Sequence, residues 1–344
     1  MSRMCHFVGS IPAKTTEDAM RSMLDWAGPH VRSITDGEVG DRYHWIVNLI
    51  NGFSEHPDLV LVRKGDWTSF DDTPKYRVRR GHTLTADALD LRHDTDALAA
   101  LPAFRKLRAE RGRDDLSFQV GIPGDLDLSL FTFGPAGAFQ HRAVFREVLG
   151  REMRRVHAEA GDDVIFQIEV PVELIFVCRM PGPLRAAMAG FLAGGVARLA
   201  REAPAGARFG LHLCLGDLNH ENLGKLSDAR PFVQLANALV RRWPADRPLE
   251  YVHAPFTGGT DPAPTDRAFY APLRDLKLGA DTRFVAGLVQ ETSSESDLRH
   301  AVELADAAHG QPVDVAASCG LARRSPEDAA ANAELARRLC EPPA

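Results

Sequence analysis

The chain has 344 residues, of which 41 are Lys or Arg and 47 are Asp or Glu, giving a formal charge of −6. Hydrophobic residues make up 44% and charged residues 26%, which excludes intrinsic disorder, a collagen-like repeat and a small disulfide scaffold. The length allows two ordinary domains or one large α/β barrel.

Short β-rich runs alternate with longer helical patterns along the chain, which is typical of a parallel sheet built from βα units. The predicted strands are Cys5–Gly9, Val31–Thr35, Leu116–Ile122, Val164–Glu169, Arg208–Leu215, Leu249–Ala254, Arg283–Val289 and Val313–Ser318. The predicted helices are Thr16–Ala27, Arg42–Gly52, Phe139–Glu159, Pro183–Glu202, Pro231–Arg242, Asp266–Leu276, Ser294–His309 and Ser325–Cys340. Eight such units predict an α/β fold, a single (β/α)8 TIM barrel formed by residues 1–344.

Residues 59–113 do not fit a simple βα unit. They contain the polar stretch 64–82 and then a helical pattern over 95–111. We expect an inserted, lid-like segment between the second and third strands, because it is too small and too polar to hold its own core. An insertion without a functional role is an equally open interpretation. Three aromatic residues in the segment are candidates to line a substrate channel or to anchor it to the barrel, namely Trp67, Phe70 and Tyr76.

Basic residues are scattered along the chain, and no apolar run reaches the roughly 18 to 20 residues of a membrane span. We therefore expect neither nucleic acid nor a membrane as a partner. The start of the chain lacks the apolar core of a secretory signal, which predicts a cytoplasmic location. The five cysteines are widely spaced without any Cys-x-x-Cys, which argues against a disulfide framework.

A candidate metal site follows from the fifth and eighth strands, because active sites of such barrels lie at the C-terminal strand ends. His212 and Cys214 are two residues apart on an extended segment, so their side chains project to one face. Cys319 follows the eighth strand, across the barrel mouth from the fifth. Imidazole and thiolate ligands suit zinc better than magnesium or calcium. Asp217 and His220 are candidates to orient His212 by hydrogen bonding, although a loop without that role is equally open.

The sixth and seventh strands offer candidates for a fourth metal ligand. His253 stands at the end of the sixth strand, and Glu250 lies three residues deeper, roughly 10 Å along an extended chain. Because His253 is nearer to the end of the strand, we expect it rather than Glu250 to be the fourth ligand. Glu250 and Glu291 remain as alternatives.

Other strand ends carry groups that suit an amino acid. The Gly9-Ser10 turn after the first strand offers backbone amides for a carboxylate. Glu38, after the second strand, and Glu169, at the end of the fourth, offer carboxylates for an ammonium group. Each junction is ordinary by itself, but their joint placement on strand ends favours a binding site.

These motifs resemble those of the cobalamin-independent methionine synthases, in particular the C-terminal catalytic barrel, within the superfamily that also holds uroporphyrinogen-decarboxylase-like barrels. Val8-Gly9-Ser10 with Pro12 is similar to the family's Gly-Ser-Phe-Pro, and Asp36-Gly37-Glu38 is similar to its His-Gly-Glu. The other matches are Gln167-Ile168-Glu169-Val170-Pro171 to Gln-Ile-Asp-Glu-Pro, His212-Leu213-Cys214 to His-x-Cys, and Cys319-Gly320-Leu321 with Arg324 to Asp-Cys-Gly-Leu-Lys-Thr-Arg. The chain resembles a divergent, stand-alone member.

The resemblance implies a zinc-dependent methyltransferase. It implies that His212, Cys214 and Cys319 hold zinc and that a small-molecule thiol binds the metal as a thiolate, ready to accept a methyl or other alkyl group. It also implies that the Gly-Ser turn and the two glutamates bind the ends of an amino-acid thiol. The alkyl donor it suggests is a folate or a corrinoid.

The sequence departs from the family at two strand ends. The family's fourth zinc ligand is a Glu, and His253 takes its place here. Where the family uses a His to assist methyl transfer, this chain has Gln290 and Glu291, which we take as the candidate catalytic residues. Two other functions therefore stay open: a zinc-dependent lyase or hydrolase acting on a sulfur-containing small molecule, and a non-catalytic barrel that binds zinc or a ligand.

Overall fold

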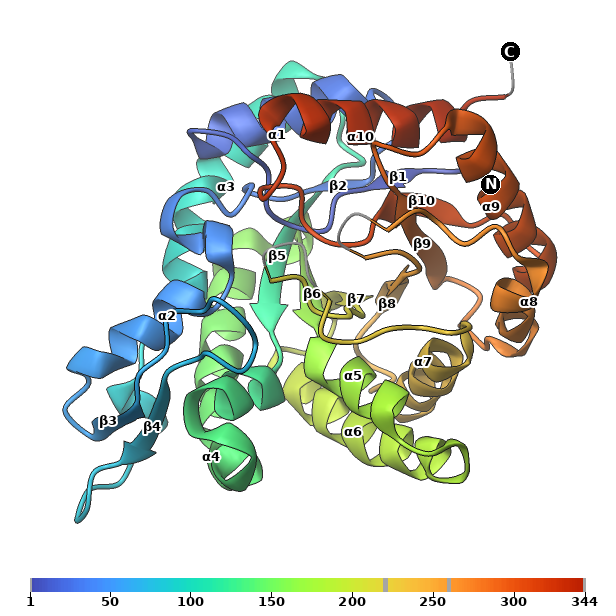
Figure 1. Ribbon diagram of the computed structural model, residues 1–344. Helices are drawn as coiled ribbons and strands as arrows, with labels where there is room; N and C mark the ends of the chain where they lie inside the picture. The colour runs from blue at the N-terminus through green and yellow to red at the C-terminus, as the bar shows by residue number, and fades with distance from the viewer. Residues whose placement is uncertain (1, 219–221, 259–260, 343–344) are drawn as a thin grey trace.

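Eight parallel strands form one sheet in the computed structural model, which describes residues 2–218, 222–258 and 261–342. The strand order is β1-β10-β9-β8-β7-β6-β5-β2, and a parallel bridge between Cys5 and Val31 connects β1 to the segment that leads into β2. The sheet is thus a nearly closed barrel, and helices surround it (Figure 1). The structure confirms the predicted TIM-barrel fold.

The barrel strands follow the predicted order and differ from the prediction mainly in length. β6 and β9 have the predicted bounds, whereas β1 and β2 are only two residues long because the chain turns away from the ladder where the barrel closes. The strands are β1 (Cys5–His6), β2 (Ser33–Ile34), β5 (Ser117–Pro123), β6 (Val164–Glu169), β7 (Arg208–His212), β8 (Leu249–Pro255), β9 (Arg283–Val289) and β10 (Asp314–Ala317).

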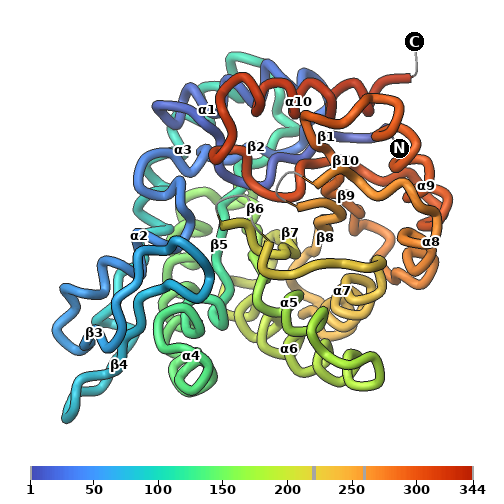
Figure 2. Tube along the Cα trace, in the orientation of Figure 1, coloured from blue at the N-terminus to red at the C-terminus, as the bar shows by residue number. Residues whose placement is uncertain are grey.

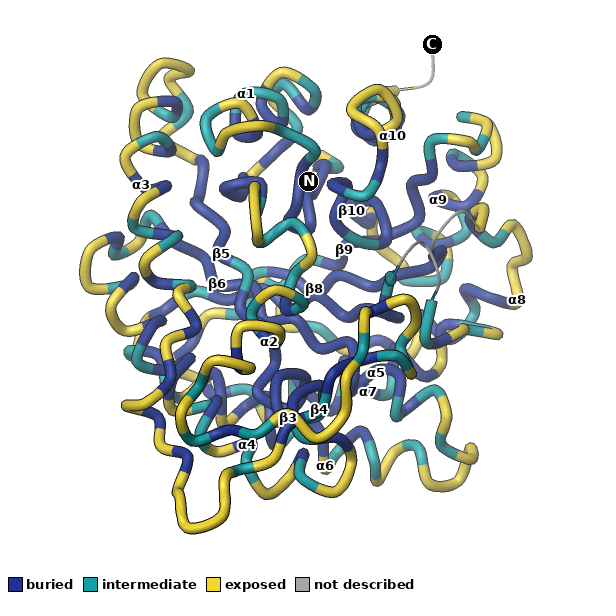
Figure 3. The backbone as a smooth tube through the Cα atoms, turned by 60° about the vertical axis from the view of Figure 1, so that its left-hand side comes forward, coloured by how far each residue is buried: buried dark blue, intermediate teal, exposed yellow. Residues whose placement is uncertain are grey.

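The helices cover the outside of the barrel, and their exposed sides face away from the buried strands (Figure 3). They are α1 (Thr16–Ala27), α3 (His93–Glu110), α4 (Asp125–Ala160), α5 (Pro171–Arg179), α6 (Gly182–Glu202), α7 (Arg230–Arg242), α8 (Arg267–Tyr270), α9 (Glu295–His309) and α10 (Pro326–Cys340). Side-chain oxygens of Thr15, Ser294 and Ser325 accept the backbone N–H three residues on, which explains where α1, α9 and α10 begin.

The helix of the second βα unit differs from the prediction. The predicted helix Arg42–Gly52 is instead the 3-10 helix η1 (Gly40–His44) and the short helix α2 (Val47–Gly52). The outer layer at this position is formed by α3, which packs against α1, α4 and β5. α3 buries an apolar face that includes Leu101 and Phe104, so it is a barrel helix rather than part of an insertion spanning residues 59–113.

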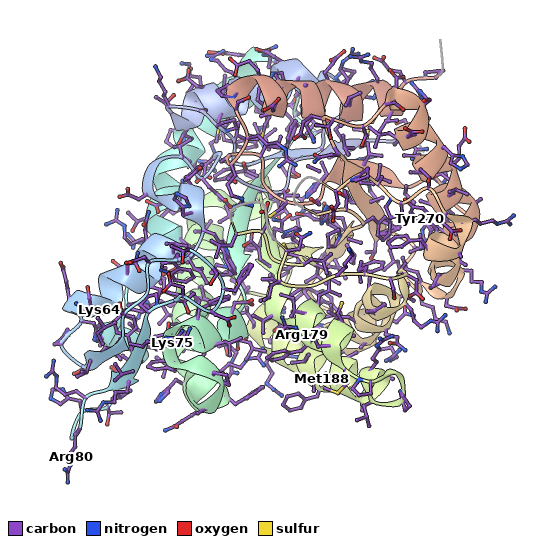
Figure 4. All side chains as sticks on the ribbon, in the orientation of Figure 1. Lys64, Lys75, Arg80, Arg179, Met188 and Tyr270 are labelled. Atoms are coloured by element: carbon purple, nitrogen blue, oxygen red, sulfur yellow. The ribbon has the colours of Figure 1, made fainter. Side chains whose placement is uncertain are left out.

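The remaining insertion is an antiparallel hairpin of β3 (Leu59–Arg63) and β4 (Lys75–Val78). It projects from the barrel beside α4 (Figure 2). Lys75, which Figure 4 labels on this hairpin, donates a hydrogen bond of 2.7 Å to the backbone carbonyl of Phe131 in α4. The hairpin is thereby attached to the barrel on one side.

Polar side chains that bond to one another fill the barrel interior below its C-terminal end. Gln167 Oε1 accepts hydrogen bonds from Gln119 Nε2 at 3.2 Å and from the Tyr251 hydroxyl at 3.0 Å, and it lies 3.1 Å from His6 Nε2. A Cβ on Gly210 would lie 2.0 Å from the Tyr251 ring, so only glycine leaves room for that side chain. Across the described residues, the helices are too short or too polar to cross a bilayer.

Candidate functional site

One imidazole and two thiols meet at the C-terminal end of the barrel. His212 ends β7, Cys214 follows two residues later, and Cys319 follows β10 on the other side of the barrel. One ligand atom from each of the three lies within 4.8 Å of the others, and the two Sγ atoms are 3.9 Å apart. Strand alternation explains why His212 and Cys214 lie on the same face. The residues that alternate with them point to the opposite face and are buried, namely Leu211, Leu213 and Leu215.

The two thiols differ in their electrostatic surroundings. The hydrogen bond from Cys214, the charge of Arg323 and the His212 side chain hold the pKa of Cys319 well below its ordinary value. The same hydrogen bond, together with burial, raises the pKa of Cys214. Arg323 Nη2 lies 3.3 Å from Cys319 Sγ and 2.9 Å from Asp217 Oδ2. Of the two thiols, Cys319 is therefore the more acidic, and Cys214 is its hydrogen-bond donor.

His253 does not join this group. Its Nδ1 lies 2.8 Å from His212 Nδ1, and its Nε2 lies 3.0 Å from the carbonyl oxygen of Ala317, so both ring nitrogens are engaged elsewhere. The side chain is fully buried behind His212, because the two residues are register partners on β7 and β8. The other two fourth-ligand candidates are not part of the group either: Glu250 pairs with Arg208, and Glu291 pairs with Arg324.

Two carboxylates lie together beside the candidate metal-ligand group, by which we mean His212, Cys214 and Cys319. A Cβ on Gly121 would be 2.9 Å from Glu38 Oε1 and 3.4 Å from Glu169 Oε1. Burial, with the nearby charge of Asp36, raises the pKa of Glu38 to about 7. Burial and the charge of Glu38 also raise the pKa of Glu169 well above its ordinary value. A ligand cation at this place would relieve the repulsion between the two carboxylates.

The Gly9-Ser10 turn is held between the ends of β2 and β10. Thr35 Oγ1 donates to the Gly9 carbonyl at 2.7 Å, and the Leu321 amide donates to the Ser10 carbonyl at 2.7 Å. A Cβ on Gly320 would lie 2.3 Å from Ser10 Oγ. The close packing places this turn beside Cys319.

These groups share one cavity of about 960 Å³, the solvent at its mouth included. Its polar wall contains the metal-ligand group, the two glutamates and the Gly-Ser turn. The facing wall is largely aromatic and is formed by Tyr43, Trp45, Trp67, Phe70 and Phe131. Trp67 and Phe70 come from the loop between β3 and β4, whereas Tyr76 is buried within the hairpin region. A cavity of this size and composition suits a small molecule with an apolar part.

Gln290 and Glu291, the expected catalytic residues, lie outside the cavity lining. Arg324 Nε donates to Glu291 at 2.8 Å, Arg324 Nη2 donates to Gln290 Oε1 at 3.1 Å, and Asn332 Nδ2 donates to Glu291 at 2.9 Å. These contacts join the end of β9 to α10. The structure thus has both side chains in contact with Arg324 rather than in the lining of the cavity.

Two residues, Asp217 and His220, are expected to orient His212 by hydrogen bonding. Asp217 bonds to Arg323, and the partner of His212 is His253. His220 lies outside the described residues.

Sequence reasoning missed Arg323 and Trp45, which both line the cavity. The motif match pointed to Arg324 instead, since a loop after a strand has no periodicity that tells which of two adjacent arginines faces inward. Trp45 lies just after η1 with a positive φ of 56°, a conformation that the sequence does not signal.

No family model matches the chain, and neither does any curated protein sequence. Among solved structures, the fold is similar to that of a B12-independent methionine synthase from Shewanella sp. W3-18-1 in complex with selenomethionine. That match has a TM-score of 0.61 and 15% sequence identity, and it covers 98% of this chain and 95% of the other. A putative vitamin-B12-independent methionine synthase from Listeria monocytogenes is also similar, with a TM-score of 0.55, 13% identity, and 99% and 98% coverage. The chain therefore has the fold of these enzymes over nearly its whole length.

Proposed function

We propose that the protein is a zinc-dependent enzyme that activates a small thiol for methyl or other alkyl transfer, as a methionine-synthase-like thiol S-alkyltransferase. The observation that carries the proposal is the convergence of His212, Cys214 and Cys319 within 4.8 Å of one another in a cavity. The likeness in fold to methionine synthases supports it.

The donor set fits zinc. His212, Cys214 and Cys319 would hold the ion, because a nitrogen and two sulfur ligands suit zinc and leave magnesium and calcium without oxygen ligands. When bound, zinc would lower the pKa of a coordinating substrate thiol and keep its sulfur nucleophilic at neutral pH. Arg323, at 3.3 Å from Cys319 Sγ, offsets part of the negative charge of the thiolates.

The rest of the cavity would orient the thiol. Glu38 and Glu169 would accept hydrogen bonds from an ammonium group, and the backbone amides at Gly9-Ser10 would receive a carboxylate, because all of these groups line the same cavity. The aromatic wall that contains Trp67 and Phe70 would exclude water and contact the alkyl donor, for which a folate or a corrinoid is the proposed class.

A lyase or hydrolase acting on a sulfur compound is the second candidate. It is favoured by one observation: Gln290 and Glu291, at the strand end where the family has its assisting His, contact Arg324 and are not part of the cavity lining. A reaction that needs no acid from that strand fits this geometry as well. The third candidate function is a non-catalytic barrel that binds zinc or a ligand.

The metal content of the purified protein tests the proposal first. We expect one zinc per chain, loss of most of it in Cys214→Ala, and full retention in Cys178→Ala, whose thiol lies on α5 away from the group. Zinc-free wild-type protein, or a Cys214→Ala variant with undiminished zinc, would contradict it.

Product formation separates the candidate reactions. Methyltetrahydrofolate and a methylated corrinoid are offered with a panel of small thiols, and S-methylated product is followed by mass spectrometry. Product that depends on a donor supports the transferase. Breakdown of a thioether or thioester without a donor supports the lyase or hydrolase.

A further inference from the structure

Three groups form a buried hydrogen-bonded row that ends at the metal-ligand group. The carbonyl oxygen of Ala317 lies 3.0 Å from His253 Nε2, and His253 Nδ1 lies 2.8 Å from His212 Nδ1. His253 is fully buried and His212 is 2% exposed. Because water does not reach these nitrogens, each must find its proton or its acceptor within the row.

The row has one arrangement of protons. A carbonyl oxygen only accepts, so the proton of His253 sits on Nε2. With its single proton on Nε2, the fully buried ring has a lone pair on Nδ1, which therefore accepts. His212 must then donate from Nδ1, so its Nε2 is the nitrogen that faces the two thiols and that, without a proton, can bind a metal.

We propose that His253 is a positioning residue that fixes His212 as its Nδ1–H tautomer and presents the Nε2 lone pair to the metal. The identity of the metal in this inference rests on the proposed function, whereas the tautomer does not. His253 thus has a different task from the ligand that the strand position suggests, and the protein ligands are His212, Cys214 and Cys319.

Three features of the barrel strands determine how His212, His253 and the Ala317 carbonyl lie relative to one another. His212 and His253 are register partners on adjacent strands, with ring centroids 4.7 Å apart. A Cβ on Gly287 of β9 would lie 2.5 Å from His253 Nε2, so a larger residue there would displace the ring. The β9–β10 ladder shifts register between Ala316 and Ala317, and irregularities of this kind re-aim backbone groups.

Two substitutions separate positioning from packing. His253→Leu fills the space but leaves His212 Nδ1–H and the Ala317 carbonyl without partners. His253→Gln keeps an acceptor for His212 and a donor for Ala317 in one side chain. Tyr251→Phe is the matched control, because it removes a buried polar group of the barrel interior that bonds to Gln167 and not to the row.

The first measurement is ¹⁵N NMR of the histidine side chains in metal-free protein. We expect the His212 signals of wild type, His253→Gln and Tyr251→Phe to show a protonated Nδ1. In His253→Leu the tautomers should become mixed. A wild-type His212 without a proton on Nδ1 would overturn the inference whether or not the protein proves to be an enzyme.

The second measurement is titration with Co²⁺, read from its absorption spectrum. We expect His253→Leu to bind about 10- to 100-fold more weakly, the usual effect of removing a hydrogen-bond partner of a ligating His. His253→Gln and Tyr251→Phe should keep the wild-type affinity and spectrum. Equal changes of the spectrum in both His253 variants would show that His253 is a ligand, and unchanged affinity in His253→Leu would show that it has no positioning role. Normal Co²⁺ binding without thiol alkylation would contradict only the proposed function.

Discussion

At the scale of single residues, glycines at the site are required by space. A Cβ on Gly9 would be 2.7 Å from Glu38 Oε1, and the corresponding contacts of Gly287 and Gly320 are 2.5 Å to His253 Nε2 and 2.3 Å to Ser10 Oγ. These distances are shorter than van der Waals contact, so a Cβ at any of the three positions would overlap with the neighbouring side chain. Glycine leaves that space free for Glu38, His253 and Ser10. None of these three glycines has a positive φ, which separates them from turn glycines such as Gly28.

We expect Gly9→Ala to weaken binding of thiols that carry an α-amino group by about tenfold, because the Glu38 carboxylate must move and one charge-assisted hydrogen bond is lost. The affinity of the zinc-loaded protein for an aminothiol and for the same thiol without its amino group measures the effect. Gly182→Ala is the control, since a Cβ there meets nothing within 4 Å. Equal weakening for both thiols would contradict the role given to Glu38.

At the scale of elements, charged side chains are buried where α4, α5 and α6 meet. Arg142 Nη2 lies 2.6 Å from Asp125 Oδ1 and 3.5 Å from Glu173 Oε1. A Cβ on Gly195 of α6 would be 2.3 Å from the Arg142 guanidinium, which explains the small residue there. Burial raises the pKa of Glu173 to about 7, against an ordinary value of 4.5. α5 begins two residues after Glu169, so this packing also supports one wall of the cavity.

The raised pKa gives the fold a pH dependence of definite sign. Between about pH 4.5 and 7 the folded protein holds a proton on Glu173 that the unfolded chain has released, so stability falls as pH rises through this range. We expect Glu173→Gln to gain about 2 to 3 kcal/mol relative to wild type on going from pH 5 to pH 8. Urea unfolding at the two pH values measures this change.

The control for this prediction is Glu334→Gln. Hydrogen bonds from Arg337 lower the pKa of Glu334, so its titration lies below the range and its substitution should leave the pH 5 to pH 8 difference unchanged. A Glu173→Gln variant with the wild-type pH dependence would refute the assignment.

At the scale of the whole molecule, the cavity is assembled from parts far apart in the sequence. Its lining runs from Val8 after β1 to Arg323 after β10, and it includes the β3–β4 loop. A Cβ on Gly216, after β7, would be 3.0 Å from the Phe70 ring, so that loop extends over the mouth of the barrel. Binding at the metal-ligand group would join the loops after β7 and β10.

We therefore expect zinc to stabilise the whole fold. A free zinc concentration 100 times the dissociation constant adds about 2.7 kcal/mol to the free energy of unfolding, which raises the melting temperature by several degrees. Thermal unfolding with zinc or with a chelator measures the shift, and Cys319→Ala should abolish it while Cys178→Ala keeps it. An equal shift in Cys319→Ala would place the stabilising zinc elsewhere.

Periodicity in the sequence determined the order of the barrel strands, the bounds of β6 and β9, and the starts of the capped helices, because these depend on local alternation and local hydrogen bonds. It also determined that His212 and Cys214 share a face. These parts of the fold and site could be predicted from the residues themselves.

Only the tertiary structure decided which helix covers the second unit, that Arg323 rather than Arg324 lines the cavity, and that Glu291 contacts Arg324. It likewise decided that His253 faces His212 and not the space between the thiols. The physical reason is that a strand pattern specifies the face on which a side chain lies, whereas its distance from a partner depends on register and barrel closure. Those depend on packing between residues far apart in the chain.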